Sequence, residues 1–275
     1  MKTESIFKWL KGIDMSTSKL QHALAAAVIG VAGVAGSAHA ATVDTVLSLV
    51  IDVSGSIDGT EYTTQMKGYA EAFRDTSIQN GILDMGGGDV GKIAVNVVQF
   101  GTSASEVIGF TILDSIMKIN DFATALEGQS RVEGGSTDIA EGIDVAAQTI
   151  ASWLNTAGNA ATRRVIDVSG DGTDNTGGSV TVARNAACPP NVINGITVGG
   201  GASLLNYYQN SVQCGTGSFS LAAADFDDFG NVVKTKLRAE ITGEPPTVPL
   251  PASAVLLLAG LGGFAAFKRK PSKKS

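Results

Sequence analysis

Short apolar runs alternate with amphipathic segments from residue 43 to residue 243, and this alternation limits the folds that are open to the chain. The runs are rich in valine and isoleucine, as in residues 93–100, which favours buried strands. The segments between them place apolar residues at helical spacing, as in Tyr62, Met66 and Tyr69. Apolar strands that alternate with helices are typical of a mostly parallel sheet with helices on both faces. The sequence therefore predicts an α/β fold with a doubly wound, mostly parallel central sheet.

The same patterns give an approximate position for each element. The predicted strands cover residues 45–52, 93–100, 105–110, 163–169, 194–198 and 218–222, and the third is short enough to lie at an edge. The predicted helices cover residues 58–73, 115–127, 137–154, 179–187, 204–212 and 226–241. The first helix begins with a capping box, because Asp58 precedes Glu61 by three residues. Two polar stretches, 80–91 and 129–136, are predicted to be loops.

The beginning of the chain has the composition of a targeting segment. Residues 1–40 run from four lysines through the apolar stretch 23–34 to Ala38-His39-Ala40. This is the order of a secretory signal peptide that is cut after Ala40. A membrane anchor is the alternative, although the apolar stretch is short for a transmembrane span.

The end of the chain has a second targeting signal. Residues 249–267 carry no charge and are long enough to cross a bilayer, and the basic residues after them favour a cytoplasmic end. With Val248-Pro249-Leu250-Pro251-Ala252 before it, this segment resembles the bacterial PEP-CTERM sorting tails. The resemblance implies processing by an exosortase-like membrane protease. The predicted parts of the chain are a signal peptide (1–40), a main domain (41–242), a Pro-rich linker with the sorting motif (243–251) and a transmembrane tail with a basic end (252–275).

The main domain is acidic and contains no histidine. Residues 41–242 hold 23 Asp and Glu against 11 Lys and Arg, a net charge of about −12. An acidic surface repels phosphate backbones, which argues against nucleic-acid binding and favours cation capture. Both histidines, His22 and His39, precede the predicted cleavage point. The mature protein therefore lacks the residue needed for Ser-His-Asp or Cys-His catalysis and for histidine-ligated zinc.

Cys188 and Cys214 are the only cysteines of the chain. In an exported protein the two are expected to form a disulfide, which would stabilise the fold by roughly 3–4 kcal/mol in the chain-entropy model. Two free buried thiols are the alternative, because the sequence does not show whether the two side chains have the geometry that a disulfide needs.

One strand end carries the main chemical signal. The run Val50–Ile57 passes from a buried strand into a polar turn with the spacing Asp52-x-Ser54-x-Ser56. If the extended path persists through the turn, alternate side chains face the same way, and one carboxylate meets two hydroxyls. Three hard oxygens at the carboxyl end of a strand can hold a small divalent cation. An ordinary polar turn is the alternative interpretation.

Two later loops carry further oxygens. Gly134-Gly135-Ser136-Thr137 opens a predicted helix, and Asp171 follows a later strand. A doubly wound sheet brings such loops together near the switch in strand order. Each residue also has a simpler interpretation, with Thr137 as a helix N-cap and Asp171 as an ordinary loop acid. The stretch Val165–Gly170 repeats the sequence of Val50–Gly55, which makes Asp167 the alternative to Asp171.

The order of these motifs resembles the von Willebrand factor type A domain with its metal-ion-dependent adhesion site, over roughly residues 43–242. The motifs are Asp-x-Ser-x-Ser, then Gly-Gly-x-Thr before a helix, then Asp-Gly after a later strand. The resemblance implies that the hydroxyls of Ser54, Ser56 and Thr137 coordinate a cation, and that Asp52 and Asp171 bind it directly or through water. The family usually has Thr or Ser before its last Asp-Gly, where this chain has Gly170.

Such a set of ligands predicts a hard cation with one position open. Compared with a cage made only of carboxylates, two carboxylates and three neutral hydroxyls under-neutralise a divalent cation. Octahedral Mg²⁺ or Mn²⁺, or alternatively Ca²⁺, can therefore accept a carboxylate from a partner. We expect an exported, non-enzymatic module that binds a protein or another acidic ligand through the metal. Its location would be the periplasm, the cell surface or the outside of the cell, with a membrane tether at least until the tail is processed.

Two other functions stay open at this point. A metal-assisted phosphohydrolase would use Asp52 as its nucleophile, as phosphotransfer enzymes on related α/β folds do. Against it, the mature chain lacks histidine, a second carboxylate two residues after Asp52 and an evident phosphate-clamping lysine there. A structural surface or matrix protein with a vestigial metal site is the third interpretation.

Overall fold

The computed structural model describes residues 41–246, except Glu133 and Ala157. The predicted signal peptide, the sorting motif and the transmembrane tail lie outside the described residues, and their boundaries stay predictions. Among the helices of the described part, none is both long and apolar enough to cross a bilayer.

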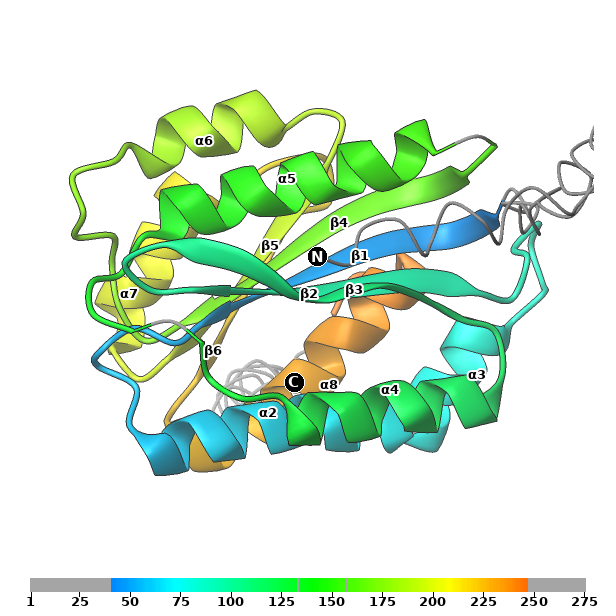
Figure 1. The fold of residues 1–275 in the computed structure, drawn as a ribbon, viewed down its shortest axis with the longest axis horizontal. Coiled ribbons are helices and arrows are strands. Elements are labelled where there is room, and N and C mark those ends of the chain that lie inside the picture. The colour runs from blue at the N-terminus through cyan, green and yellow to red at the C-terminus, as the bar shows by residue number, and fades with distance from the viewer. Residues whose placement is uncertain (1–40, 133, 157, 247–275) are drawn as a thin grey trace, which may run out of the picture. The chain divides into compact units, whose positions relative to one another are not determined.

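A six-stranded sheet forms the centre of the domain (Figure 1). The strands are β1 (Thr42–Asp52), β2 (Ile93–Phe100), β3 (Ala104–Leu113), β4 (Ala160–Gly170), β5 (Val192–Val198) and β6 (Ser220–Ala223). Their order across the sheet is β3-β2-β1-β4-β5-β6, and every neighbouring pair is parallel except β2 and β3. The strand β3 lies at an edge as predicted, but it is longer than expected. These findings confirm the predicted doubly wound, mostly parallel sheet.

Helices cover both faces of this sheet (Figure 1). On one face lie α2 (Gly59–Arg74), α3 (Thr76–Leu83), α4 (Ile116–Gly128) and α8 (Phe226–Thr242). On the other lie α5 (Ile139–Asn155), α6 (Val180–Ala187), α7 (Gly201–Tyr207) and the π-helical turn η3 (Tyr208–Val212). Because β2 is buried along its whole length and β1 from its second residue on, each face has its own apolar core, as the continuous apolar runs predict.

The N-terminal cap of α2 confirms the predicted capping box. The Asp58 carboxylate accepts from the backbone N–H of Glu61 at 2.9 Å, and the Glu61 carboxylate accepts from the backbone N–H of Asp58 at 2.8 Å. The cap satisfies backbone donors that the first helical turn leaves unpaired. The chain therefore turns sharply from the end of β1 into α2, which fixes the loop between them.

The helix α3 corrects the sequence analysis, which predicted a loop from residue 80. Its few apolar residues and the central Gly81 give it a weak helical pattern. In the structure Gly81 lies against the end of α8, where an added side-chain carbon would be 3.3 Å from Thr242 Cγ2. Packing against α8 therefore stabilises a helix that its own sequence favours only weakly.

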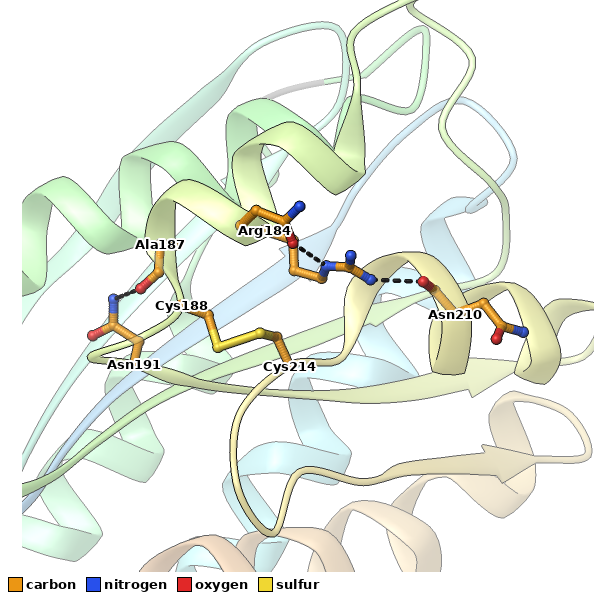
Figure 2. Close-up of a disulfide and its surroundings, with 7 residues drawn as sticks. Arg184, Ala187, Cys188, Asn191, Asn210 and Cys214 are labelled. Atoms are coloured by element: carbon orange, nitrogen blue, oxygen red, sulfur yellow. Dashed lines mark hydrogen bonds between the residues drawn. A yellow bond between two sulfur atoms is a disulfide. The ribbon is translucent and has the colours of Figure 1, made fainter.

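A disulfide joins Cys188, directly after α6, to Cys214, which lies between η3 and β6 (Figure 2). Cys214 forms an isolated bridge with Ile193 of β5, through hydrogen bonds of 2.8 and 3.0 Å. Nearby, the Arg184 guanidinium donates to the carbonyl of Asn210 at 2.6 Å, which is a second link between α6 and η3. The predicted pairing is confirmed, and the alternative of two free thiols is wrong.

The order of the strands places a switch point beside β1. The loop after β1 leads to α2 on one face, and the loop after the neighbouring strand β4 leads to α6 on the other face. Two loops that leave adjacent strands in opposite directions open a crevice at the carboxyl ends of those strands. The predicted site residues Asp52 and Asp171 lie at or directly after these two strand ends.

Candidate metal centre

The loop after β1 begins with a carboxylate that the sheet buries completely. Asp52 is the last residue of β1, and its Oδ1 accepts the backbone N–H of Ser54 at 2.8 Å. The turn then closes through the Ile57 N–H, which donates to the carbonyl of Ser54 at 3.1 Å. An aspartate that bonds to the backbone two residues later is a usual device of polar turns. In this turn the Ser54 side chain is buried and the Ser56 side chain is exposed.

A chain of hydrogen bonds joins the three predicted loops. The Ser56 hydroxyl donates to Asp171 Oδ1 at 2.7 Å, and the Ser54 and Ser56 hydroxyls are 3.2 Å apart. The Thr137 hydroxyl donates to Ser54 Oγ at 3.1 Å. The structure therefore brings together the side chains of Ser54, Ser56, Thr137 and Asp171 next to Asp52. Their role as metal ligands stays a prediction.

Thr137 does not cap the helix α5. Asp138 is the N-cap, and its Oδ1 accepts the backbone N–H of Glu141 at 2.9 Å. The Thr137 backbone is instead paired with Asn175 of the third loop, whose Oδ1 accepts the Thr137 N–H at 2.8 Å and whose own N–H donates to the Thr137 carbonyl at 3.0 Å. The simpler interpretation of Thr137 as a cap is wrong, and its hydroxyl is directed to the cluster.

Asp167 lies away from the cluster. It pairs in register with Leu49, three residues before Asp52, and its side chain is on the opposite face of the sheet, against α8. There it forms an ion pair with Lys236 at 2.6 Å, and both side chains are fully buried. Of the two acids that the sequence offers, Asp171 is the one that reaches the first loop.

Close backbone contacts join the loop that contains Gly134 and Thr137 to the residues after β2. The N–H of Thr102 donates to the carbonyl of Gly134 at 2.8 Å, and the N–H of Asp138 donates to the carbonyl of Gly101 at 2.9 Å. An added side-chain carbon at Gly101 would lie 2.5 Å from the Gly134 oxygen, so only glycine permits this approach. The Gly-Gly pair of the motif therefore belongs to a contact between two backbones, which brings Thr137 to the strand ends.

Arg131, which was not among the predicted site residues, binds the backbone of the loop after β1. Its Nη1 donates to the carbonyl of Ile57 at 2.7 Å, and its Nη2 lies 2.5 Å from the carbonyl oxygens of both Val53 and Ser54. A planar guanidinium with five donors is suited to such a fork of acceptors. Because these contacts are made to backbone carbonyls, no side-chain motif in the first loop indicates them.

The electrostatics of Asp52 suit a bound cation. Burial raises the pKa of this carboxyl to about 6, hydrogen bonds from Ser54 oppose the shift, and the charge of Asp171 adds to it. Asp52 Oδ2 is buried and has no hydrogen-bond partner among the described residues. A buried carboxylate with a free oxygen is costly unless a positive charge or a donor compensates it. A divalent cation between the loops would supply that charge.

The oxygen ligands that the cluster offers favour particular kinds of cation. Within the described residues no group of three or more His, Cys, Asp or Glu side chains is placed to hold a metal. The cluster instead offers two carboxylates and three hydroxyls, which are hard neutral or anionic oxygens. Oxygen ligands of this type suit Mg²⁺, Mn²⁺ or Ca²⁺ rather than a soft transition metal.

A family model matches most of the described residues. The model described as a protein of unknown function, DUF1194, matches residues 42–245. No curated protein matches the sequence at a significant level.

Solved structures share the fold. The chain is similar to proximal thread matrix protein 1 from the mussel byssus, with a TM-score of 0.53 and 16% identity over 72% of this chain and 46% of that one. It is also similar to the pilus adhesin SpaC from Lactobacillus rhamnosus GG, with a TM-score of 0.51 and 14% identity over 72% of this chain and 30% of that one. The chain thus spans less than half the length of either protein. At this level of identity the likeness shows the fold alone, and it supports the expected similarity to von Willebrand factor type A domains.

Proposed function

The chain belongs to the DUF1194 family of proteins of unknown function, whose fold is of the von Willebrand factor type A kind, and we propose that it is an adhesion module that depends on a divalent cation. The observation that carries the proposal is the hydrogen-bonded cluster of hydroxyls and carboxylates from three loops at the switch point of the sheet. The residues that would hold the cation are Asp52, Ser54, Ser56, Thr137 and Asp171.

The burial of these residues gives the site one open side. Asp52 and Ser54 are fully buried and Thr137 is 5% exposed, whereas Ser56 is exposed and Asp171 is partly exposed. When bound, the cation supplies a positive charge that can attract a carboxylate oxygen from a partner. The three hydroxyls add no negative charge, so they leave that attraction largely intact. A protein or another acidic ligand is therefore the partner that we propose.

The chemistry of the surroundings argues for binding rather than catalysis. An Asp52 nucleophile would have to reach a substrate, but its side chain is buried and one of its oxygens already accepts from the Ser54 N–H. The Arg131 guanidinium donates to the backbone carbonyls of Val53, Ser54 and Ile57. We therefore propose a module without enzymatic activity, in place of the phosphohydrolase alternative.

The solved relatives support this proposal at the level of the fold. The mussel byssal protein contains a zinc-occupied MIDAS motif, and the Lactobacillus protein is a pilus adhesin. Together with the predicted signal peptide and sorting tail, they favour action at the cell envelope. An exosortase-like protease and the inner membrane are the further partners that the tail implies.

Calorimetric titration of the purified protein with Mg²⁺, Mn²⁺ and Ca²⁺ tests the cation site. We expect saturable binding of one divalent cation to the unmodified protein, and no binding to Asp52→Ala. Asp114→Asn is the matched control, because Asp114 lies at the opposite end of the sheet from the cluster. It directly follows Leu113, which pairs with Ile93, the first residue of β2. Equal binding to Asp52→Ala and the unmodified protein would contradict the site as proposed.

A further inference from the structure

The absence of a side chain at Gly170 lets two buried oxygens come close together. Gly170 is the last residue of β4, next to Asp52 of β1. A side-chain carbon added to Gly170 would lie 2.7 Å from Asp52 Oδ2 and 2.7 Å from the hydroxyl oxygen of Tyr208. Because each oxygen is 2.7 Å from the same point, the two oxygens are at most about twice that distance apart, which a single bridging water molecule can span.

Both oxygens are buried and lack a partner within the described part of the chain. Tyr208 is 0% exposed, as is Asp52. A buried polar atom without a hydrogen bond costs roughly 1–3 kcal/mol, so two such oxygens this close together indicate a shared water.

Two unusual features of the backbone place Tyr208 close to Gly170. Tyr208 begins the π-helical turn η3, and such turns are rare and often lie at functional sites. Its ring also lies over Gly195 of β5, where a side-chain carbon would be 2.7 Å from Tyr208 Cδ1. Glycines at Gly170 and Gly195 therefore leave the space that the tyrosine ring and its hydroxyl occupy.

We propose that Tyr208 is a positioning residue for the cation site, whose hydroxyl donates to Asp52 Oδ2 through one buried water. A carboxylate can accept several hydrogen bonds, so Asp52 can accept from the Ser54 N–H and from Tyr208 and still offer lone pairs to a cation. The contact fixes the orientation of the carboxylate before the cation arrives. Its effect on cation binding rests on the proposed function, but the contact itself does not.

A double-mutant cycle without added metal tests the contact. The melting temperatures of the unmodified protein, Tyr208→Phe, Asp52→Asn and the double variant are compared in the presence of EDTA. If the hydroxyl and the carboxylate interact, the two single changes do not add in the double variant. Additive changes overturn the proposal, whatever the protein does with metals.

Cation affinity then tests the positioning role. By calorimetry we expect Tyr208→Phe to bind Mg²⁺ or Mn²⁺ at least about tenfold more weakly, as is usual when an outer partner of a metal ligand is removed. Tyr69→Phe is the matched control, because Tyr69 is equally buried but lies on the opposite face of the sheet. Unchanged affinity in Tyr208→Phe overturns the positioning role. If the unmodified protein binds neither cation, the proposed function fails, and the cycle alone decides whether the contact exists.

Discussion

The Ser56 hydroxyl donates to Asp171 Oδ1 at 2.7 Å, although the two residues are 115 positions apart in the chain. This hydrogen bond links the loop after β1 to the loop after β4. The two residues are also the most exposed members of the cluster, so they border the side from which a partner would approach. Their contact is the most direct sign that the separate loops form one site.

Replacing Asp171 by asparagine removes one of the two carboxylates and keeps the size of the side chain. We expect Asp171→Asn to fold normally, because the side chain is partly exposed and an amide oxygen can still accept from Ser56. Its affinity for Mg²⁺ should fall by at least about tenfold, because a charged oxygen ligand is lost. Calorimetric titration beside Asp114→Asn measures the difference. Equal affinities of the two variants would contradict a role for Asp171.

Adding a methyl group at Gly170 should disturb Asp52. In Gly170→Ala the new carbon would lie 2.7 Å from Asp52 Oδ2 and 3.1 Å from Asp52 Cβ, so the carboxylate has to move. We expect a loss of about 1–3 kcal/mol in the free energy of unfolding, as for other overpacked cores, together with weaker cation binding. Denaturant unfolding measures the loss of stability.

Gly172→Ala is the control for that change. The nearest atom to a side-chain carbon at Gly172 is Thr137 Oγ1, at 3.8 Å, which is an ordinary contact. We expect its stability to be within about 0.5 kcal/mol of the unmodified protein. Similar losses of stability in the two variants would mean that the close approach of Asp52 to Gly170 does not cause the loss in Gly170→Ala.

Arg131 is expected to preorganise the first loop. In Arg131→Gln the carbonyls of Val53, Ser54 and Ile57 lose their shared donor, and we expect a loss of about 1.5–3 kcal/mol in unfolding free energy. Arg131→Lys should recover only part of it, because an ammonium cannot reproduce the planar fork. Denaturant unfolding of the three proteins measures this order. Full recovery by lysine would show that charge alone matters at this position.

A buried ion cluster under α8 gives the domain a dependence on pH. Lys236 contacts both Asp167 and Glu240, and Asn194 donates to Glu240 at 2.9 Å. Burial, followed by the charge of Asp167, raises the pKa of Glu240 to about 8. In the unfolded chain this carboxyl ionises near its ordinary value of 4.5, whereas the folded protein keeps the proton up to about pH 8. Stability should therefore fall as the pH rises between these values and level off above them.

Denaturant unfolding at pH 6, 7 and 8 measures this slope. For one group the decrease approaches about 1.4 kcal/mol per pH unit. We expect Glu240→Gln to flatten the dependence, because the amide cannot ionise in either state. The exposed Glu244 provides the control Glu244→Gln, which should keep the slope of the unmodified protein. A slope that persists in Glu240→Gln would assign the effect to another group.

The sequence predicts the fold and the membership of the cluster for one reason. Buried strands and strand ends leave strong local signals, such as the apolar run of β2 and the spacing of Asp52, Ser54 and Ser56. Because parallel strands share one carboxyl edge, their order along the chain is enough to expect that the loops meet.

The remaining features depend on packing between distant segments, which leaves no local pattern. Arg131 donates to backbone carbonyls, and the Tyr208 hydroxyl comes near Asp52 only because Gly170 and Gly195 lack side chains. The helix α3 depends in the same way on its contact with α8. Two choices between nearby residues illustrate the limit. Only the structure shows that Asp138 rather than Thr137 is the cap of α5, and that Asp171 rather than Asp167 faces the cluster.

Metal-dependent thermal stability tests the central claim most directly. A ligand that binds only the native state stabilises it by about 2.7 kcal/mol at a concentration of 100 times its Kd. We expect saturating Mg²⁺ or Mn²⁺ to raise the Tm of the purified protein by several degrees over EDTA, and to leave the Tm of folded Asp52→Ala unchanged. A Tm that rises equally in both proteins, or in neither, would contradict the cation site.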